Sequence, residues 1–162
     1  MGIVETATEL LQQAAIGHPL FHNEVILAAL VFVVTASAVG LCVPGLLMPI
    51  SFTAGMLMES WLAIPIVAAG AMLGSHALFL LARTGMRDTL ERRFGDRVDR
   101  FRPHIERYGV AYTAGLRIIG TPHVLVTLAS AAGRLRHGSF ALASFLGFLP
   151  AIALSVGAAS AI

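Results

Sequence analysis

Apolar residues occur along this chain in long runs that contain no Asp, Glu or Arg. Residues 25–43, 61–81 and 140–162 are such runs, each about 20 residues long. A helix of that length crosses a hydrocarbon core of about 30 Å, so the pattern predicts three membrane-crossing helices. Within the second run, Gly70 and Gly74 lie about one helical turn apart, which predicts a close contact with another helix on that face.

Two further apolar segments, 44–57 and 108–135, are interrupted by Pro and Gly. The first segment has three breaks within twelve residues, at Pro44-Gly45, Pro49 and Gly55. A membrane-crossing helix tolerates one such break. Three breaks favour a re-entrant hairpin, which leaves the membrane on the side where it began, and whose backbone groups are satisfied by protein or water.

The two interrupted segments repeat each other. The shared pattern is Pro, nine residues, Ala-Gly, one residue and Leu, and a long apolar segment follows each copy. It occurs at Pro44, Ala54, Gly55 and Leu57 and again, 78 positions later, at Pro122, Ala132, Gly133 and Leu135. Matching interruptions in the two halves of a chain indicate broken helices that face each other near the membrane midplane.

Two stretches have the periodicity of amphipathic helices. In residues 1–17 and again in residues 84–107, apolar side chains recur at a spacing near 3.6, with charged or polar side chains on the other faces. Both are expected to lie on the membrane surface, the second with a break near Pro103. The alternative for the first is packing against a partner domain, and for the second packing against the protein's own underside.

The charge of the chain is concentrated in one segment. All eleven Lys and Arg residues are Arg, and eight of them lie in residues 83–107. The positive-inside rule therefore predicts a cytoplasmic location for this segment, so that the first hairpin opens outward and the second inward. The alternative, a complete crossing by residues 108–132, places Arg134 and Arg136 outside. Nearby acidic residues almost balance the Arg charge, which argues against nucleic-acid binding.

The composition agrees with a membrane protein. The chain is 57% hydrophobic and 12% charged, far from a soluble domain, and would leave large apolar surfaces in water. We expect one all-α integral membrane domain, built as an inverted repeat of two re-entrant helix hairpins, each followed by a crossing helix. Its segments are an interfacial helix (1–17), a first repeat (24–83), an Arg-rich amphipathic helix (84–107) and a second repeat (108–162).

No catalytic or metal-binding constellation is evident in the sequence. Cys42 is the only Cys, so it forms no internal disulfide and no Cys-based metal site. The apolar segments contain no His-x-x-x-His pair, no acidic cluster and no nucleophile with an acid–base partner. No enzymatic activity, cofactor or metal is therefore expected.

Three stretches carry a likeness to one known family. They are Val43-Pro44-Gly45 with Thr53-Ala54-Gly55-Met56-Leu57, then Gly74-Ser75 with Phe79, Ala82-Arg83 and Gly85, and finally Tyr108-Gly109, Arg117, Pro122, Ala132-Gly133, Phe140 and Gly147. In their order and spacing the chain resembles the DedA family, also called the VTT or SNARE-associated membrane protein domain. Leu46 and Ser75 stand where the family has acidic residues, and His123 lies near the family's second hairpin Arg.

The resemblance implies lipid translocation in the bacterial cytoplasmic (inner) membrane, by a flippase or scramblase of undecaprenyl phosphate or phospholipid. It implies proton coupling less well, because the acids linked to coupling in the family are replaced at Leu46 and Ser75. The alternative is a non-transporting accessory subunit that binds another membrane protein. The expected partners are lipids with anionic headgroups, together with a second copy of the chain or a membrane-protein partner.

A site between the two hairpins is predicted to bind the lipid, because helix N-termini offer amide donors and about half a positive charge to a phosphate. Arg117 adds a permanent charge and bidentate donors; the alternative is an Arg that extends to the cytoplasmic headgroups. The other candidate binding residues are Pro44, Gly45, Ser51, Gly55, Thr121, Pro122, His123 and Gly133. His76 and Glu59 are candidate proton-coupling residues, with a packing His and a solvated loop Glu as the alternatives.

Overall fold

The computed structural model of this protein describes residues 24–43, 45–84, 87–133 and 135–161. Within these ranges the helices are α2 (Glu24–Gly40), α3 (Leu47–Leu57), α4 (Ser60–Thr84), α5 (Arg87–Ile118), α6 (His123–Ala132) and α7 (His137–Ala159). Every regular element of the described residues is helical, which confirms the predicted all-α class. The helix expected at residues 1–17 lies outside the described residues.

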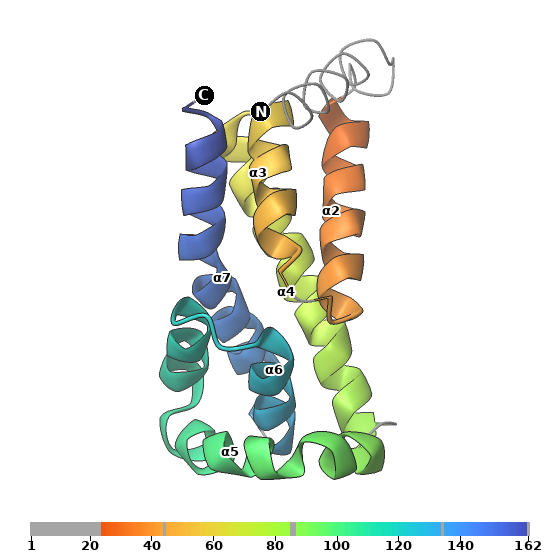
Figure 1. Cartoon of the computed structure of the whole chain (residues 1–162), viewed down its shortest axis with the longest axis vertical. Coiled ribbons are helices and arrows are strands. Elements are labelled where there is room, and N and C mark those ends of the chain that lie inside the picture. Colours follow the sequence, from red (N-terminus) through yellow and green to blue (C-terminus); the bar gives the residue numbers. More distant parts are fainter. Residues whose placement is uncertain (1–23, 44, 85–86, 134, 162) are drawn as a thin grey trace, which may run out of the picture.

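Two long helices organise the molecule. In Figure 1, α4 and α7 extend along its whole length, in contact with each other and in opposite directions. α2 and α3 lie beside the upper half of α4, and the connection between them contains turns at residues 41–42 and 45–46. α5 crosses the lower end and bends upward, and α6 leads back down after a turn at residues 119–122. Both turns therefore lie near the middle of the long axis.

Among the described residues, the two long helices are also the ones long and apolar enough to cross a membrane. α4 has 25 residues and α7 has 23, and both are sufficiently apolar. The run 25–43, predicted to cross as one helix, is helical only to Gly40. α2 therefore has 17 residues and a length of about 25 Å, less than a hydrocarbon core of about 30 Å. The helix at this position is therefore shorter than the complete third crossing predicted for residues 25–43, because a helix cap follows Gly40.

The contact between α2 and α4 depends on glycine, as the spacing of Gly70 and Gly74 predicts. A Cβ at Gly70 would lie 2.8 Å from the carbonyl oxygen of Phe32, and a Cβ at Gly74 would overlap the carbonyl oxygen of Ala36. The two backbones thus approach more closely than any side chain allows. Close approach through small residues is the usual way in which helices associate in lipid.

Large apolar side chains cover the outside of the molecule, whereas much of its interior is built from small residues. Ala63, Ala68 and Ala71 of α4 are fully buried. The most exposed large apolar side chains are Val25, Val33, Leu41, Trp61, Ile118, Ile119 and Leu154. This distribution, with small residues inside and large apolar residues outside, is suited to a lipid environment rather than to water.

The turn after α2 is a Schellman cap. The N–H of Val43 donates to the carbonyl of Ala38 (3.1 Å), and the N–H of Cys42 donates to the carbonyl of Val39 (3.1 Å). Cys42 has the left-handed conformation that the motif requires, with φ of 62°. The cap ends the helix while it satisfies backbone groups that would otherwise be unpaired at the turn.

The same cap recurs after α5, at the same offset as the sequence repeat. The N–H of Thr121 donates to the carbonyl of Leu116 (3.0 Å), and the N–H of Gly120 donates to the carbonyl of Arg117 (3.2 Å). Gly120 has φ of 86°. Each of these residues lies 78 positions after its counterpart in the first turn. The repeat seen in the sequence is therefore also a repeat of backbone geometry at the two central turns.

Replacing Cys42 by Gly is expected to stabilise the protein by about 0.5–1 kcal/mol, because an L-residue with positive φ is strained and Gly is not. The measurement is the midpoint of thermal unfolding in detergent. Ser37→Gly, in the interior of α2, is the matched control and is expected to destabilise by a similar amount, because Gly there only adds conformational freedom to the unfolded chain. Equal losses in both variants would contradict the prediction.

The Arg-rich helix differs from the prediction in two respects. α5 continues through Pro103, where a break was expected, and is broken instead at Gly109 (φ 53°, ψ −118°). Val98 and Ile105 of its apolar stripe are buried against α4 and α6, with Leu128 in the same cluster. Along this part of α5 the stripe therefore packs on the protein's own underside, which was the alternative to a membrane-surface helix.

Candidate functional site

Arg117 is a charged side chain in the interior of the molecule. It lies one residue before the end of α5, and only 6% of it is exposed. Its aliphatic part crosses α7 at Gly147, where a Cβ would lie 2.7 Å from the Cβ of Arg117. Gly147 thus provides the space that the Arg side chain occupies. The alternative of an Arg that extends to the surface headgroups does not apply in this conformation.

The guanidinium of Arg117 is held mainly by aromatic rings. Its central carbon is 4.4 Å from the ring centroid of Phe148 and 5.4 Å from that of Phe140, both on α7. Nη2 donates a hydrogen bond to Oγ1 of Thr127 on α6 (3.2 Å). Nε and Nη1 have no hydrogen-bond partner among the described residues, and no carboxylate there pairs with Arg117. The site thus contains a buried positive charge for which the described part of the chain provides no counter-ion.

Two buried hydroxyl groups lie on α4 and α7, one helical turn from the rings that surround this charge. Ser144 is one helical turn from both Phe140 and Phe148, so it shares the face of α7 that Arg117 covers. The ring of Phe79 on α4 stacks on Phe140 at 4.3 Å. Ser75 precedes Phe79 by one helical turn on α4, and Ser144 follows Phe140 by one helical turn on α7. Because α4 and α7 are antiparallel, both Ser residues lie on the same side of the ring pair, toward the middle of the molecule. Both residues are fully buried.

Neither Ser75 Oγ nor Ser144 Oγ has a hydrogen-bond partner among the described residues. We call Arg117, Thr127, Ser144 and Ser75 the buried polar cluster. It offers the unpaired guanidinium N–H groups and two free hydroxyls, which are donors suited to an anion.

Aromatic side chains separate the buried polar cluster from the lower end of the molecule. His76 lies 5.9 Å from Phe79 and 5.8 Å from His137, measured between ring centroids. Arg83 is half-buried below them, with Nη1 3.3 Å from Nε2 of His137 and its guanidinium 5.1 Å from the Phe79 ring centroid. We call His76, Phe79, His137 and Phe140 the aromatic layer. His76 Nδ1 is buried without a partner among the described residues.

The two central turns are connected by His123. Its Nε2 lies 3.0 Å from the carbonyl oxygen of Val39, the last turn of α2. Because a carbonyl only accepts, the hydrogen bond requires a proton on Nε2. Thr121 is half-buried next to it, and Pro122 and Gly45 are exposed. His123 therefore joins the second turn to the end of α2, with Thr121 and Pro122 in that turn and Gly45 in the other, whereas Pro44 lies outside the described residues.

Three other predicted binding residues take part in packing rather than in this cluster. The hydroxyl of Ser51 donates to the carbonyl of Leu47 within its own helix (2.6 Å). A Cβ at Gly55 would lie 2.8 Å from the carbonyl oxygen of Val156, so Gly55 allows α3 and α7 to touch. Gly133 is buried at the end of α6.

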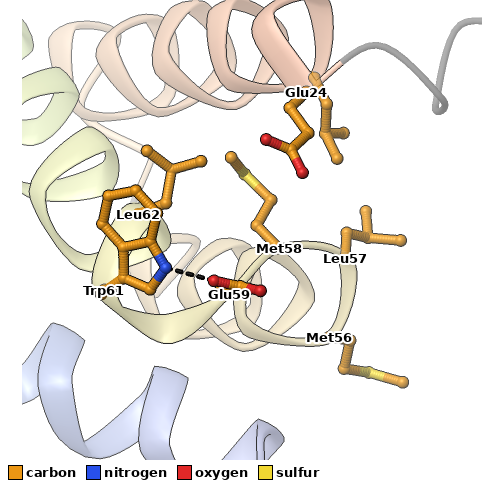
Figure 2. A pocket seen from close by; sticks show the side chains of 8 residues that line it. Glu24, Met56, Leu57, Met58, Glu59, Trp61 and Leu62 are labelled. Atoms are coloured by element: carbon orange, nitrogen blue, oxygen red, sulfur yellow. Dashed lines mark hydrogen bonds between the residues drawn. The ribbon is translucent and has the colours of Figure 1, made fainter.

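Glu59 is remote from the buried polar cluster. It lies between α3 and α4, at the end of the molecule opposite α5, and accepts a hydrogen bond from Nε1 of Trp61. Glu59, Glu24 and Met58 line a cavity of about 490 Å³, and Figure 2 shows their side chains around it. Both carboxylates are exposed. Within the described residues no group of three or more His, Cys, Asp or Glu side chains could hold a metal ion.

Sequence reasoning found Arg117 but missed its surroundings on α7. Ser144 lies four residues after Phe140 and four before Phe148. This spacing places all three on one helix face, and a Ser between two Phe residues in a crossing helix was the available signal. The sequence does not reveal that Arg117 lies against that face, because this depends on how α5 docks on α7.

A protein-family model described as the VTT domain matches residues 43–161. The match contains both central turns except the first residues of the earlier one, and it contains the whole buried polar cluster. No curated protein matches the chain, and no solved structure matches it.

Proposed function

The chain belongs to the VTT domain family, the DedA or SNARE-associated family, and is a membrane protein; from this premise we propose that it moves phosphate-bearing lipids across the bilayer. The lipid is an undecaprenyl phosphate or a phospholipid, and the membrane is the bacterial cytoplasmic membrane. In this proposal the pairs α2–α3 and α5–α6 are re-entrant hairpins whose turns lie inside the membrane, so the first hairpin includes α2, which the sequence assigned to a crossing helix, in addition to residues 44–57.

The side chains at the two turns support this placement. Leu41 is 76% exposed and Ile119 is 81% exposed, each at the tip of its turn. Turns in contact with water are usually polar, so apolar tips at mid-height favour a hydrocarbon environment. The Schellman caps supply partners for turn N–H groups, which lipid cannot do.

The buried, unpaired charge of Arg117 is the observation that carries the proposal. An Arg inside a membrane domain is costly, and such residues usually serve a substrate or ion path. A phosphate that reaches this site would receive charge-assisted hydrogen bonds from Nε and Nη1, which have no partner among the described residues. These bonds would replace part of the headgroup's lost hydration and so lower the barrier to its passage.

The position of Arg83 suggests a route to the site from one side. With residues 83–107 in the cytoplasm, Arg83 lies at the inner membrane boundary and meets an anionic headgroup first. The aromatic layer lies between Arg83 and Arg117 along this route. Its rings must separate for a headgroup to pass from Arg83 to Arg117. His76, in this layer, is the residue that we propose for proton coupling, whereas Glu59 would act at the outer end.

Lipid exchange by the purified protein tests this function. The full chain is reconstituted in vesicles that contain a fluorescent phospholipid, and dithionite is added outside. We expect quenching beyond the outer-leaflet fraction, in contrast to protein-free vesicles, because lipids from the inner leaflet become accessible. If quenching stops at that fraction for phospholipid and for undecaprenyl phosphate, the proposal is wrong, and a co-purifying membrane protein would then favour the accessory function.

A further inference from the structure

We propose that the buried polar cluster selects lipid headgroups with one negative charge, which are phosphodiesters, over phosphomonoesters with two. This inference rests on the proposed function and specifies its substrate class. It follows from the number of charges and donors that the described residues place around Arg117.

The cluster supplies one permanent positive charge. Arg117 forms no ion pair among the described residues, and the other members of the cluster, Thr127, Ser144 and Ser75, are neutral. Arg83, also cationic, lies beyond the aromatic layer and is occupied by His137 and Phe79. A bound phosphodiester would therefore be neutralised by Arg117, whereas a dianion would keep one charge without a partner in a medium of low dielectric constant.

The free donors of the cluster match a phosphodiester equally well. A phosphodiester carries its charge on two non-bridging oxygens, and a guanidinium edge binds two oxygens in a bidentate manner. The hydroxyls of Ser144 and Ser75, which have no partner among the described residues, can each add a neutral hydrogen bond. Hydroxyls add donors without adding charge, so they strengthen binding of an anion and leave the preference for a monoanion unchanged.

Other titratable groups face this region and must be separated from the effect. They are His76 on α4, His137 on α7 and His123 on α6, and the first two lie in the aromatic layer. Protonation of any of them adds a positive charge, which favours a dianion more than a monoanion and so lowers the ratio of the two exchange rates. The ratio is therefore compared at about pH 8, where an unperturbed His is mostly neutral and the charge preference reports Arg117.

The test compares two fluorescent lipids with identical acyl chains in vesicles that contain the full chain. One is a phosphatidylglycerol and the other a phosphatidic acid, whose second ionisation is that of a phosphomonoester, with a pKa of about 6. At about pH 8 we expect the diester to exchange more than about tenfold faster, because the dianion leaves a buried charge unpaired. Below the second pKa both lipids are monoanions, and the ratio should fall towards one.

A variant pair checks that the cluster is the cause. Ser144→Asp places a carboxylate beside Arg117 and should lower exchange of the diester at least about tenfold, whereas the uncharged Ser144→Asn should retain most of it. Should either variant fold poorly, thermal shifts of the unmodified protein in detergent by short-chain phosphatidylglycerol and phosphatidic acid measure the same preference. Equal rates and equal thermal shifts at all pH values overturn the selectivity but not the function; absence of exchange for both lipids and for undecaprenyl phosphate overturns the function itself.

Discussion

Replacing Arg117 by Met is expected to abolish most lipid exchange, by at least about 100-fold, while it stabilises the fold. Exchange falls because the charge-assisted hydrogen bonds to a phosphate, each worth about 1.5–3 kcal/mol, are lost. Stability rises because a buried Arg without a carboxylate partner costs about 2–3 kcal/mol relative to an apolar side chain of similar length. The measurements are the dithionite assay and the unfolding midpoint of the same preparation.

The matched control for this substitution is Arg102→Met. Arg102 forms an ion pair with Glu106 on α5 (3.2 Å), and both side chains are well exposed to solvent. Exposed pairs contribute about 0–1 kcal/mol, so this variant should exchange lipid at nearly the original rate and unfold at nearly the original temperature. A large loss of stability in Arg117→Met, with exchange retained, would mean that Arg117 serves the fold and not the lipid.

Gly74→Ala is expected to destabilise the protein by about 2–3 kcal/mol, although Ala favours helices more than Gly does. The added Cβ would overlap the carbonyl oxygen of Ala36 and lie 2.9 Å from the backbone nitrogen of Gly40. Backbone atoms cannot rotate away as a side chain can, so α2 must move from α4. The yield of folded protein in detergent and its unfolding midpoint measure the effect.

Gly157→Ala on α7 is the control, because a Cβ at Gly157 meets nothing within 4 Å. It is expected to stabilise the protein by up to about 1 kcal/mol through helix propensity alone. The contrast between the two Gly→Ala variants isolates helix contact from propensity. If Gly74→Ala were as stable as Gly157→Ala, the close contact between α2 and α4 would not exist.

Much of the fold follows from local sequence. The apolar runs predict α4 and α7, and Pro44-Gly45 and Pro122 predict the interruptions between α2 and α3 and between α5 and α6. Pro49 and Gly55, also predicted as breaks, lie within the continuous helix α3, so that part of the prediction was wrong. The repeat offset of 78 residues even predicts which backbone positions are equivalent in the two turns. The position of the break in α5 was predicted incorrectly because two signals compete there. Pro103 remains within the helix, and the helix bends at Gly109, which can adopt positive φ.

The candidate site could be predicted only in part. Arg117 stands out in the sequence because a permanent charge in an apolar segment is rare. Ser75 was noted only as a replacement for an acid, and Ser144 was not noted at all. Their relation to Arg117 depends on the register of α4 against α7, which the stacked rings of Phe79 and Phe140 define. Such contacts join residues more than 60 positions apart, which no local pattern encodes.

The sequence by itself determined that this protein is helical, that it belongs in a membrane, and that its two halves carry equivalent breaks. These properties depend on hydrophobicity and backbone preference, which act over a few neighbouring residues. Only the tertiary structure decided that Arg117 is enclosed by α6 and α7 with no carboxylate partner in the described part of the chain, and that the two turns are joined by the contact of His123 with Val39. Docking of distant helices sets these relations, because it depends on the shapes of whole helix faces.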